Sequence, residues 1–256
     1  MNWQPVDCHA HSTFSDGALS LAQVVERAAA LGVRPSVSDH ISRDVSRALN
    51  SAAAVRDYLD ALSRFNVYRA GEFCWHDNLW RELPDDLMRR FTHRIGSLHA
   101  VRMPDDSLVH AFARKLPADL AVSAYMDAHT SSLERLAAEM PIDVFAHPTL
   151  VTLPFRTFDV DDLWTEERET RLVEALFKHG IAFEISSRYT PHERIVRRAV
   201  DRGVRISLGS DGHTLEQVAE ISRPLAMARA LGVSDDALYD PMRHGSRTVR
   251  GSAATW

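Results

Sequence analysis

Residues 181–213 read IAFEISSRYTPHERIVRRAVDRGVRISLGSDGH, and this stretch decides the fold. Two short apolar runs, at 181–185 and 204–209, flank a segment at 193–202 in which apolar residues recur at helical spacing. Gly203 follows that segment, at the position where a glycine commonly ends a helix. A strand, a helix and a second strand in this order are typical of a parallel sheet with helical crossovers.

The same alternation runs through the rest of the chain. Further short apolar runs lie at 5–9, 34–39, 66–72, 92–99 and 142–147. Amphipathic segments of helical period lie at 19–31, 131–140 and 167–179. Seven strand units in one domain predict an α/β fold, a distorted (βα)7 barrel similar to a TIM barrel. We expect the barrel to span residues 1–242 and to be followed by a poorly ordered tail, rich in Gly, Ser, Thr and Arg, at 243–256.

Composition excludes several classes of protein. The 256 residues carry a formal net charge of -5, so no basic field attracts long nucleic acid or a membrane surface. The two cysteines, Cys8 and Cys74, indicate no disulfide framework. No secretory signal and no membrane-spanning apolar run is evident, so we expect a cytoplasmic protein. The sequence makes no prediction of oligomeric state.

Histidines gather where the predicted strands end. Six of the thirteen histidines, together with Glu72 and Asp211, lie in or directly after the ends of predicted strands, and Asp16 follows the first of these strands by several residues. In a βα barrel the carboxyl ends of the strands form the face on which active sites are built. The nine residues are His9, His11, Asp16, His40, Glu72, His99, His147, Asp211 and His213. We interpret most of the other histidines as structural or surface residues, with His110 and His129 in helical segments, although His76 and His192 lie close enough to strand ends to reach a substrate.

These nine side chains indicate a metal centre. In Asp7-Cys8-His9-Ala10-His11 an extended chain sends Asp7, His9 and His11 to the same side, where two imidazoles can bind one ion. Imidazole and carboxylate ligands without a thiolate suit zinc, iron or manganese. Nine ligands are too many for one ion and suffice for three. Three divalent ions carry +6 against -3 from the carboxylates, and such a positive pocket favours a phosphate.

The order of short motifs resembles that of a known superfamily. Asp7-Cys8-His9-Ala10-His11-Ser12, Ser15-Asp16-Gly17 and Ser38-Asp39-His40 resemble the opening of the PHP (polymerase and histidinol phosphatase) superfamily. The resemblance continues, over roughly residues 5–240, through Gly71-Glu72, Ile95-Gly96-Ser97-Leu98-His99, Ala146-His147-Pro148 and Gly209-Ser210-Asp211-Gly212-His213. Within the superfamily the chain is most similar to the histidinol-phosphate phosphatase branch.

The resemblance implies a trinuclear centre. His9, His11, Glu72 and Asp211 would hold one ion, and Glu72 would bridge to a second ion completed by His99 and His147. The third ion would be held by Asp16, His40 and His213. The resemblance also implies that Asp7 and Asp39 orient ligand imidazoles.

The expected activity is hydrolysis of a small phosphorylated metabolite, with L-histidinol phosphate, from histidine biosynthesis, as the candidate substrate. A hydroxide bridging two metal ions would attack phosphorus. Arg188 and Arg156 are the candidates for holding the phosphoryl oxygens, because a guanidinium fork matches two of them. Asp211 or a nearby histidine is the candidate acid for the leaving alcohol.

Three alternatives remain at this stage. A phosphodiesterase or nucleotidase of the same superfamily would act on nucleotides or short oligonucleotides. A zinc amidohydrolase normally uses a lysine inside the barrel, whereas the only lysines here, Lys115 and Lys178, lie in helical stretches. A metal-binding module without activity would be expected to have lost ligands.

Trp75, Trp80 and Phe155 could line a substrate pocket or pack in the core.

Overall fold

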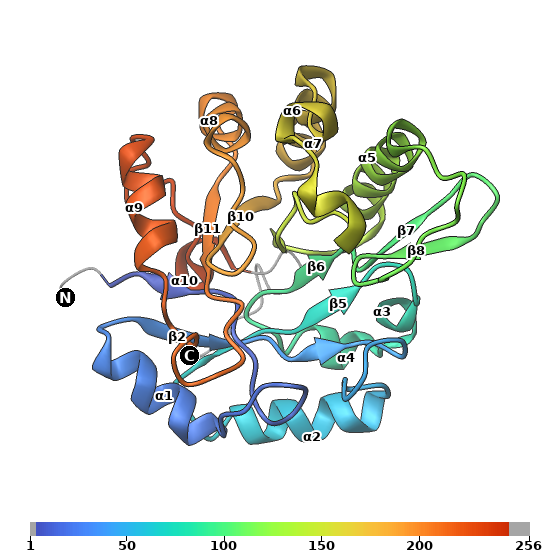
Figure 1. Cartoon of the computed structure of the whole chain (residues 1–256). Coiled ribbons are helices and arrows are strands. Elements are labelled where there is room, and N and C mark those ends of the chain that lie inside the picture. Colours follow the sequence, from blue (N-terminus) through green and yellow to red (C-terminus); the bar gives the residue numbers. More distant parts are fainter. Residues whose placement is uncertain (1–3, 246–256) are drawn as a thin grey trace.

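The computed structural model describes residues 4–245 as an α/β fold in which parallel strands lie inside a layer of helices (Figure 1). Nine strands belong to the two parallel sheets. They are β1 Val6–Asp7, β2 Arg34–Val37, β3 His40–Ile41, β4 Tyr68–Arg69, β5 Glu72–Cys74, β6 Ile95–Ser97, β9 Val144–Phe145, β10 Ala182–Ser186 and β11 Ile206–Gly209. All of them fall in or at the ends of the seven predicted runs, so the fold class is confirmed.

The two sheets are joined through the chain and through hydrogen bonds. One has the order β1-β2-β4 and the other β11-β10-β9-β6-β5-β3, and every pairing within them is parallel. Strand β3 follows β2 directly along the chain, and β5 follows β4 in the same way. At both places the chain passes from one sheet to the other. The first and last strands meet where Cys8 N donates to Leu208 O and Asp211 N donates to His9 O, both at 2.8 Å.

The helices form where the sequence supplies caps and an apolar face. They are α1 Leu21–Ala30, α2 Ala52–Leu62, α3 Leu79–Glu82, α4 Asp85–Met88, α5 Val122–Glu139, α6 Val160–Leu163, α7 Glu166–His179, α8 Glu193–Arg202, α9 Ser222–Ala230 and α10 Pro241–His244, with a 3-10 helix at Leu153–Thr157. Ser20 begins α1 with a capping box to Gln23. Gly180 and Gly203 end α7 and α8 with φ values of 65° and 85°, as the sequence predicted.

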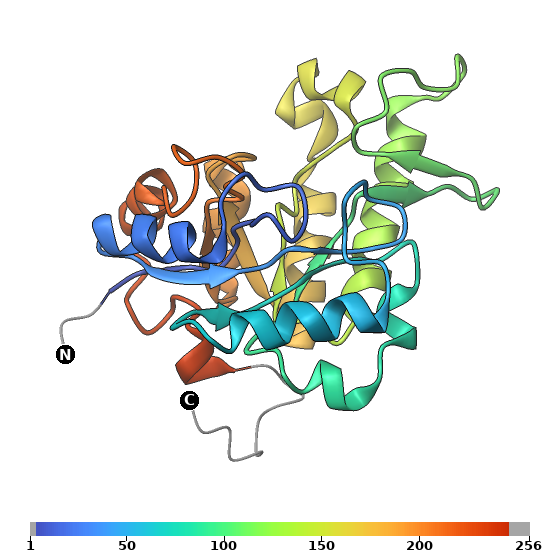
Figure 2. The ribbon, with the colours of Figure 1, turned by 90° about the horizontal axis from the view of Figure 1, so that it is seen from below.

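One hairpin interrupts the alternation. Strands β7 (Ala100–Arg102) and β8 (Leu108–His110) pair antiparallel directly after β6, and the hairpin projects from the body of the molecule in Figure 2. The prediction that His110 lies in a helix is therefore wrong, because this segment forms β8. Arg243 and His244, at the start of the expected tail, belong to α10. Residues 246–256 lie outside the described part of the chain, and none of the helices within 4–245 has the length and apolar character needed to cross a membrane.

We predict that the buried histidine of α5 makes the fold sensitive to acid. Burial lowers the pKa of His129 to about 4, while its Nε2 donates to Leu150 O at 3.0 Å. Because the unfolded chain takes up a proton near pH 6.5 and the folded chain does not, the stability from this group falls as the pH drops from 6.5 to 4. The loss at pH 5 is roughly 2 kcal/mol. In urea unfolding at pH 7 and pH 5, His129→Gln should lose less stability than the wild type by this amount. Equal losses in the two proteins would contradict the prediction.

Candidate metal centre

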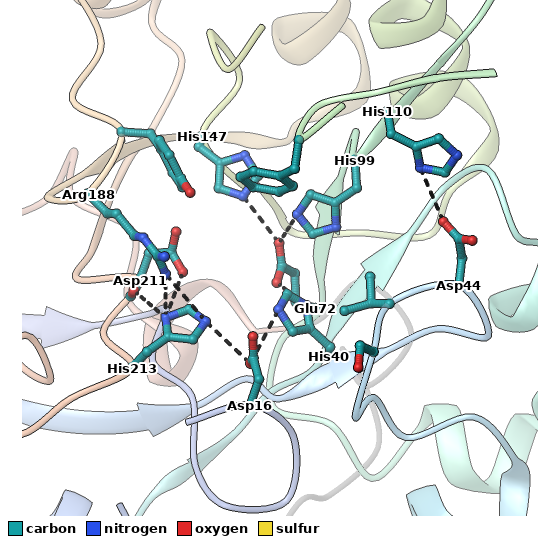
Figure 3. Close-up of a pocket in the computed structure, with 14 residues that line it drawn as sticks. Asp16, His40, Asp44, Glu72, His99, His110, His147, Arg188, Asp211 and His213 are labelled. Carbon is teal, nitrogen blue, oxygen red and sulfur yellow. Dashed lines mark hydrogen bonds and ion pairs between the residues drawn. The ribbon is translucent and has the colours of Figure 1, made fainter. Parts of the chain in front are cut away.

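All nine predicted ligands meet at the carboxyl ends of the strands. His40 and Glu72 begin β3 and β5, and the other seven lie in the loops that follow β1, β6, β9 and β11. Seven of the nine line a pocket of about 300 Å³ (Figure 3), and the other two, His9 and His11, are fully buried. The pocket is lined by Asp16, His40, Asp44, Val45, Ser46, Glu72, His99, His110, Phe112, His147, Arg188, Tyr189, Asp211 and His213.

Eight of the nine side chains form three overlapping groups whose ligand atoms lie close together, and His147 lies beside the second group. The first contains His9, His11 and Asp211, with the two imidazole Nε2 atoms 3.1 Å apart. The second contains His40, Glu72 and His99, and His147 Nε2 lies 3.3 Å from Glu72 Oε1.

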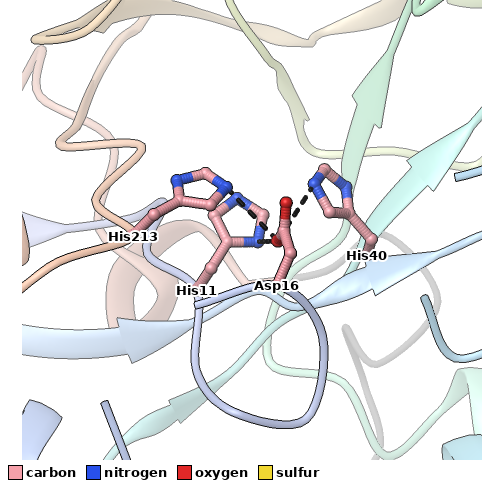
Figure 4. Close-up of side chains that lie close together, drawn as sticks. All are labelled: His11, Asp16, His40 and His213. Atoms are coloured by element: carbon pink, nitrogen blue, oxygen red, sulfur yellow. Dashed lines mark ion pairs between the residues drawn. The ribbon is translucent and has the colours of Figure 1, made fainter. Parts of the chain in front are cut away.

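The third group surrounds a carboxylate at the edge of the pocket. Asp16 Oδ1 lies 3.3 Å from His213 Nε2, 3.6 Å from His40 Nε2 and 3.9 Å from His11 Nδ1 (Figure 4). These groups overlap the three ligand sets that the resemblance implied but do not match them, because His11 and His40 are each shared between two of the groups and His147 belongs to none.

The residues present fit divalent metal ions. Glu72 is fully buried, yet neither of its carboxylate oxygens accepts a hydrogen bond from a described residue. His40 Nδ1 approaches Glu72 Oε2 to 2.7 Å without hydrogen-bond geometry. A buried ionised group without a partner is costly. Nitrogen and oxygen atoms that converge without hydrogen bonding are the arrangement expected of ligands around a common cation, and this donor set suits zinc, iron or manganese.

The carboxylates of the site are held in the ionised form. Burial raises the pKa of Glu72, but the surrounding His40, His99 and His9 outweigh it and hold the pKa well below its usual range. For Asp211 the opposing charge comes first from His9, and again the pKa falls below its usual value despite burial. Ionised carboxylates are the form that binds metal.

Glu184, in β10, is a positioning residue that the sequence analysis missed. Its Oε1 accepts a hydrogen bond from His9 Nδ1 at 2.7 Å, and its Oε2 accepts from the backbone N–H of His147 at 2.6 Å. This partner leaves His9 Nε2 directed toward the centre, as a carboxylate does for metal-bound histidines. The sequence feature that could have indicated this role is that Glu184 is the single charged residue of the apolar run at 181–185.

The backbone around Glu184 is tightly packed and, at two ligands, strained. A Cβ on Gly209 would collide with the Glu184 carboxylate and lie 2.9 Å from His9 Cβ. His147 and Asp211 have φ values of 31° and 49°, which are unusual for residues other than glycine. Such backbone strain persists only where surrounding contacts impose it, and it is common at functional sites.

The expected role of Asp7 and Asp39 requires correction. Both are buried, but their hydrogen bonds fix loops and not imidazoles. Asp7 accepts from Ser210 N at 2.8 Å and from Ala219 N at 3.0 Å, so its side chain does not face the centre as strand alternation predicted. Asp39 accepts from the backbone N–H and the hydroxyl of Ser12, at 2.8 and 2.6 Å. The two aspartates hold in place the segments that carry the ligands.

The structure brings one of the two predicted arginines to the pocket. Arg188 is exposed at the pocket wall, with Nη1 2.7 Å from His213 Nδ1. Arg156 donates to the carbonyls of Val151 and Ala111, at 3.0 Å each, and does not line this pocket. Its guanidinium lies against the rings of Phe112 and Tyr189, two residues of the pocket wall.

The structure also decides the places of several aromatic and ionisable residues that the sequence left open. Trp75, Trp80 and Phe155 belong to the buried core and not to the pocket lining. His192 also lies outside the lining, with Nε2 3.5 Å from Glu169 Oε1. Asp44 and His110 line the pocket, and the sequence analysis gave neither a role there.

Comparisons with known proteins show similarity in structure. No protein-family model and no curated protein sequence matches the chain. A Listeria monocytogenes protein assigned as a histidinol phosphatase superposes with a TM-score of 0.70 and 14% identity, over 84% of this chain and 97% of that one. Histidinol phosphate phosphatase from Lactococcus lactis, complexed with zinc, L-histidinol and phosphate, gives a TM-score of 0.69 and 15% identity, over 92% and 95%. The chain therefore has the fold of histidinol phosphatases, as the resemblance predicted.

We predict that Glu184→Gln weakens metal binding. The amide keeps the size of the side chain but removes the charge that orients His9, so the affinity for zinc should fall roughly 10–100-fold. Competition with a chromophoric chelator measures the change. Glu174→Gln, which removes an exposed carboxylate paired with Arg202 on α8, is the matched control and should bind as the wild type does. Unchanged affinity in Glu184→Gln would show that Glu184 does not support the centre.

Proposed function

We propose that the chain is a metal-dependent phosphomonoesterase that acts on a small phosphorylated metabolite, with L-histidinol phosphate as the first candidate. The observation that carries this proposal is the convergence of eight imidazole and carboxylate side chains in the region of Glu72, whose oxygens have no hydrogen-bond donor among the described residues. Two histidinol phosphatases share the fold over most of the chain, and one of them was complexed with zinc and phosphate, which supports the choice of substrate.

In this proposal the nine side chains hold three divalent ions. His9, His11, Asp211 and Glu72 bind the first, Glu72, His99 and His147 the second, and Asp16, His40 and His213 the third. When bound, such ions neutralise phosphoryl oxygens and lower the pKa of a water. The ions bring more positive charge than the three carboxylates offset, so the pocket selects a phosphate dianion.

The chain's own residues position the ester. The exposed guanidinium of Arg188 lies beside His213 at the pocket wall and can hold two phosphoryl oxygens as charge develops on them. The neighbouring His9 holds the pKa of Asp211 below its usual value, which favours a role as a ligand over a role as the acid. Arg156 lies against Phe112 and Tyr189 and supports this part of the pocket wall from outside the lining.

We predict that loss of one ligand abolishes most of the activity. His40→Ala or Asp211→Asn should reduce turnover at least about 100-fold, because changes in residues that only orient ligands already cost 10–100-fold. Phosphate release by protein reconstituted with manganese measures this, with metal content determined in parallel. His179→Gln, at the end of α7 and far from the pocket lining, is the control and should retain full turnover.

The substrate is tested with a panel of esters. L-histidinol phosphate, other phosphomonoesters, AMP and a phosphodiester are compared with the same protein, with and without EDTA. Preference for L-histidinol phosphate and loss of the rate with EDTA support the full proposal. Preference for AMP or the diester would favour the nucleotidase or phosphodiesterase alternative. Metal binding without hydrolysis of any ester would reject the proposed activity and favour a metal-binding module.

A further inference from the structure

A second cluster of metal-ligating side chains lies at the edge of the same pocket, apart from the nine residues of the candidate metal centre. It consists of Asp44, His76 and His110, whose ligand atoms all lie within 4.8 Å of one another. Asp44 follows β3, His76 lies two residues beyond β5 and His110 ends β8. Asp44 and His110 line the pocket on the side nearest His99 (Figure 3).

The geometry of this cluster suits a metal ion. His76 Nε2 and His110 Nδ1 approach the same carboxylate oxygen, Asp44 Oδ2, at 2.9 and 3.3 Å. Ligands of a tetrahedral zinc ion with bonds near 2.0 Å lie about 3.3 Å apart. Two imidazoles and one carboxylate are also the donor set of the first group of the metal centre, in which His11 Nε2 and Asp211 Oδ1 are 3.3 Å apart.

Burial supplies a second observation. The side chain of His76 is only 2% exposed, and the atom that it offers to the cluster is Nε2, which is hydrogen-bonded to Asp44 Oδ2 at 2.9 Å. Asp44 and His110 are 44% and 45% exposed, so the cluster is closed on the His76 side and open toward the pocket. Three protein ligands with one open position is the arrangement of catalytic zinc sites, whereas structural sites are closed by four ligands.

We propose that Asp44, His76 and His110 bind a further divalent transition-metal ion, of the zinc type, with one coordination position open to the pocket. A cation there would face the same cavity as the metal centre but would touch a different part of a bound molecule. Its open position would accept a lone pair, such as that of a carboxylate, an amine or an imidazole. The site extends the pocket beyond the phosphate-binding function proposed above and does not depend on it.

Metal stoichiometry tests this inference. Full-length wild type, Asp44→Asn, His110→Gln and the double variant are loaded with zinc, dialysed and measured by inductively coupled plasma mass spectrometry. Both single variants change partly exposed residues, and thermal melting verifies that they fold. Each single variant should hold one zinc equivalent fewer than the wild type, and the double variant should also lose only one. His179→Gln should bind as the wild type does.

Three further outcomes separate this site from the metal centre and from the proposed function. A variant with both Asp16→Asn and His213→Gln should lose zinc from the centre and still lose one more equivalent when Asp44→Asn is added. Equal zinc content in the wild type, Asp44→Asn and His110→Gln would overturn the inference and leave a hydrogen-bonded trio. If those variants lose one equivalent while the wild type hydrolyses no phosphoester, the site stands and the proposed function fails.

Discussion

The buried carboxylate of Glu72 is the constraint on which the site depends. It lies at the start of β5, its oxygens accept no hydrogen bond from residues 4–245, and five imidazoles approach it. Their nearest nitrogens are those of His40 at 2.7 Å, His99 and His147 at 3.3 Å, His9 at 3.5 Å and His11 at 3.7 Å. An isolated charge in this position would be very unfavourable, so the surrounding cations or bound ions must stabilise it.

The fold surrounds Glu72 with these imidazoles because it brings the ends of several strands together. Parallel strands deliver their carboxyl ends to one face, and each needs to supply only one to three ligands. Glu184 in β10 connects two of these ends, because it bonds to the ring of His9 and to the backbone of His147. Asp7 and Asp39 then fix the flanking loops through serine hydroxyls and backbone N–H groups. The ligands are therefore supported by a buried polar network that stabilises their positions before any substrate arrives.

The sequence predicted the strands and the nine candidate ligands because both follow from local pattern. Apolar runs locate strands, and histidines at the ends of those runs must meet if the strands are parallel. The hairpin of β7 and β8 could not be predicted in this way, since the residues after His99 show no clear period. Because the hairpin was not predicted, the approach of His110 to Asp44 could not be predicted either. Contacts between residues so far apart in the chain depend on how loops fold over the barrel.

Positioning residues were harder to identify than ligands. Glu184 was visible only as a charge within an apolar strand, and nothing local indicated which imidazole it would meet. Asp7 and Asp39 lie beside ligands in the sequence, which suggested contact with imidazoles, yet their side chains turn to the neighbouring loops. The contacts of Arg156 could not be predicted from the sequence either. The loop that carries it folds so that its guanidinium donates to backbone carbonyls.

The most direct test of the central claim is a crystal structure with anomalous scattering measured at metal absorption edges, from protein purified without added metal and soaked with phosphate. The account predicts anomalous peaks within bonding distance of Glu72, of His9 with Asp211, and of Asp16 with His213, and phosphate density between these peaks and Arg188. A fully ordered site with no anomalous peak, in which Glu72 is instead hydrogen bonded to protonated histidines, would contradict it.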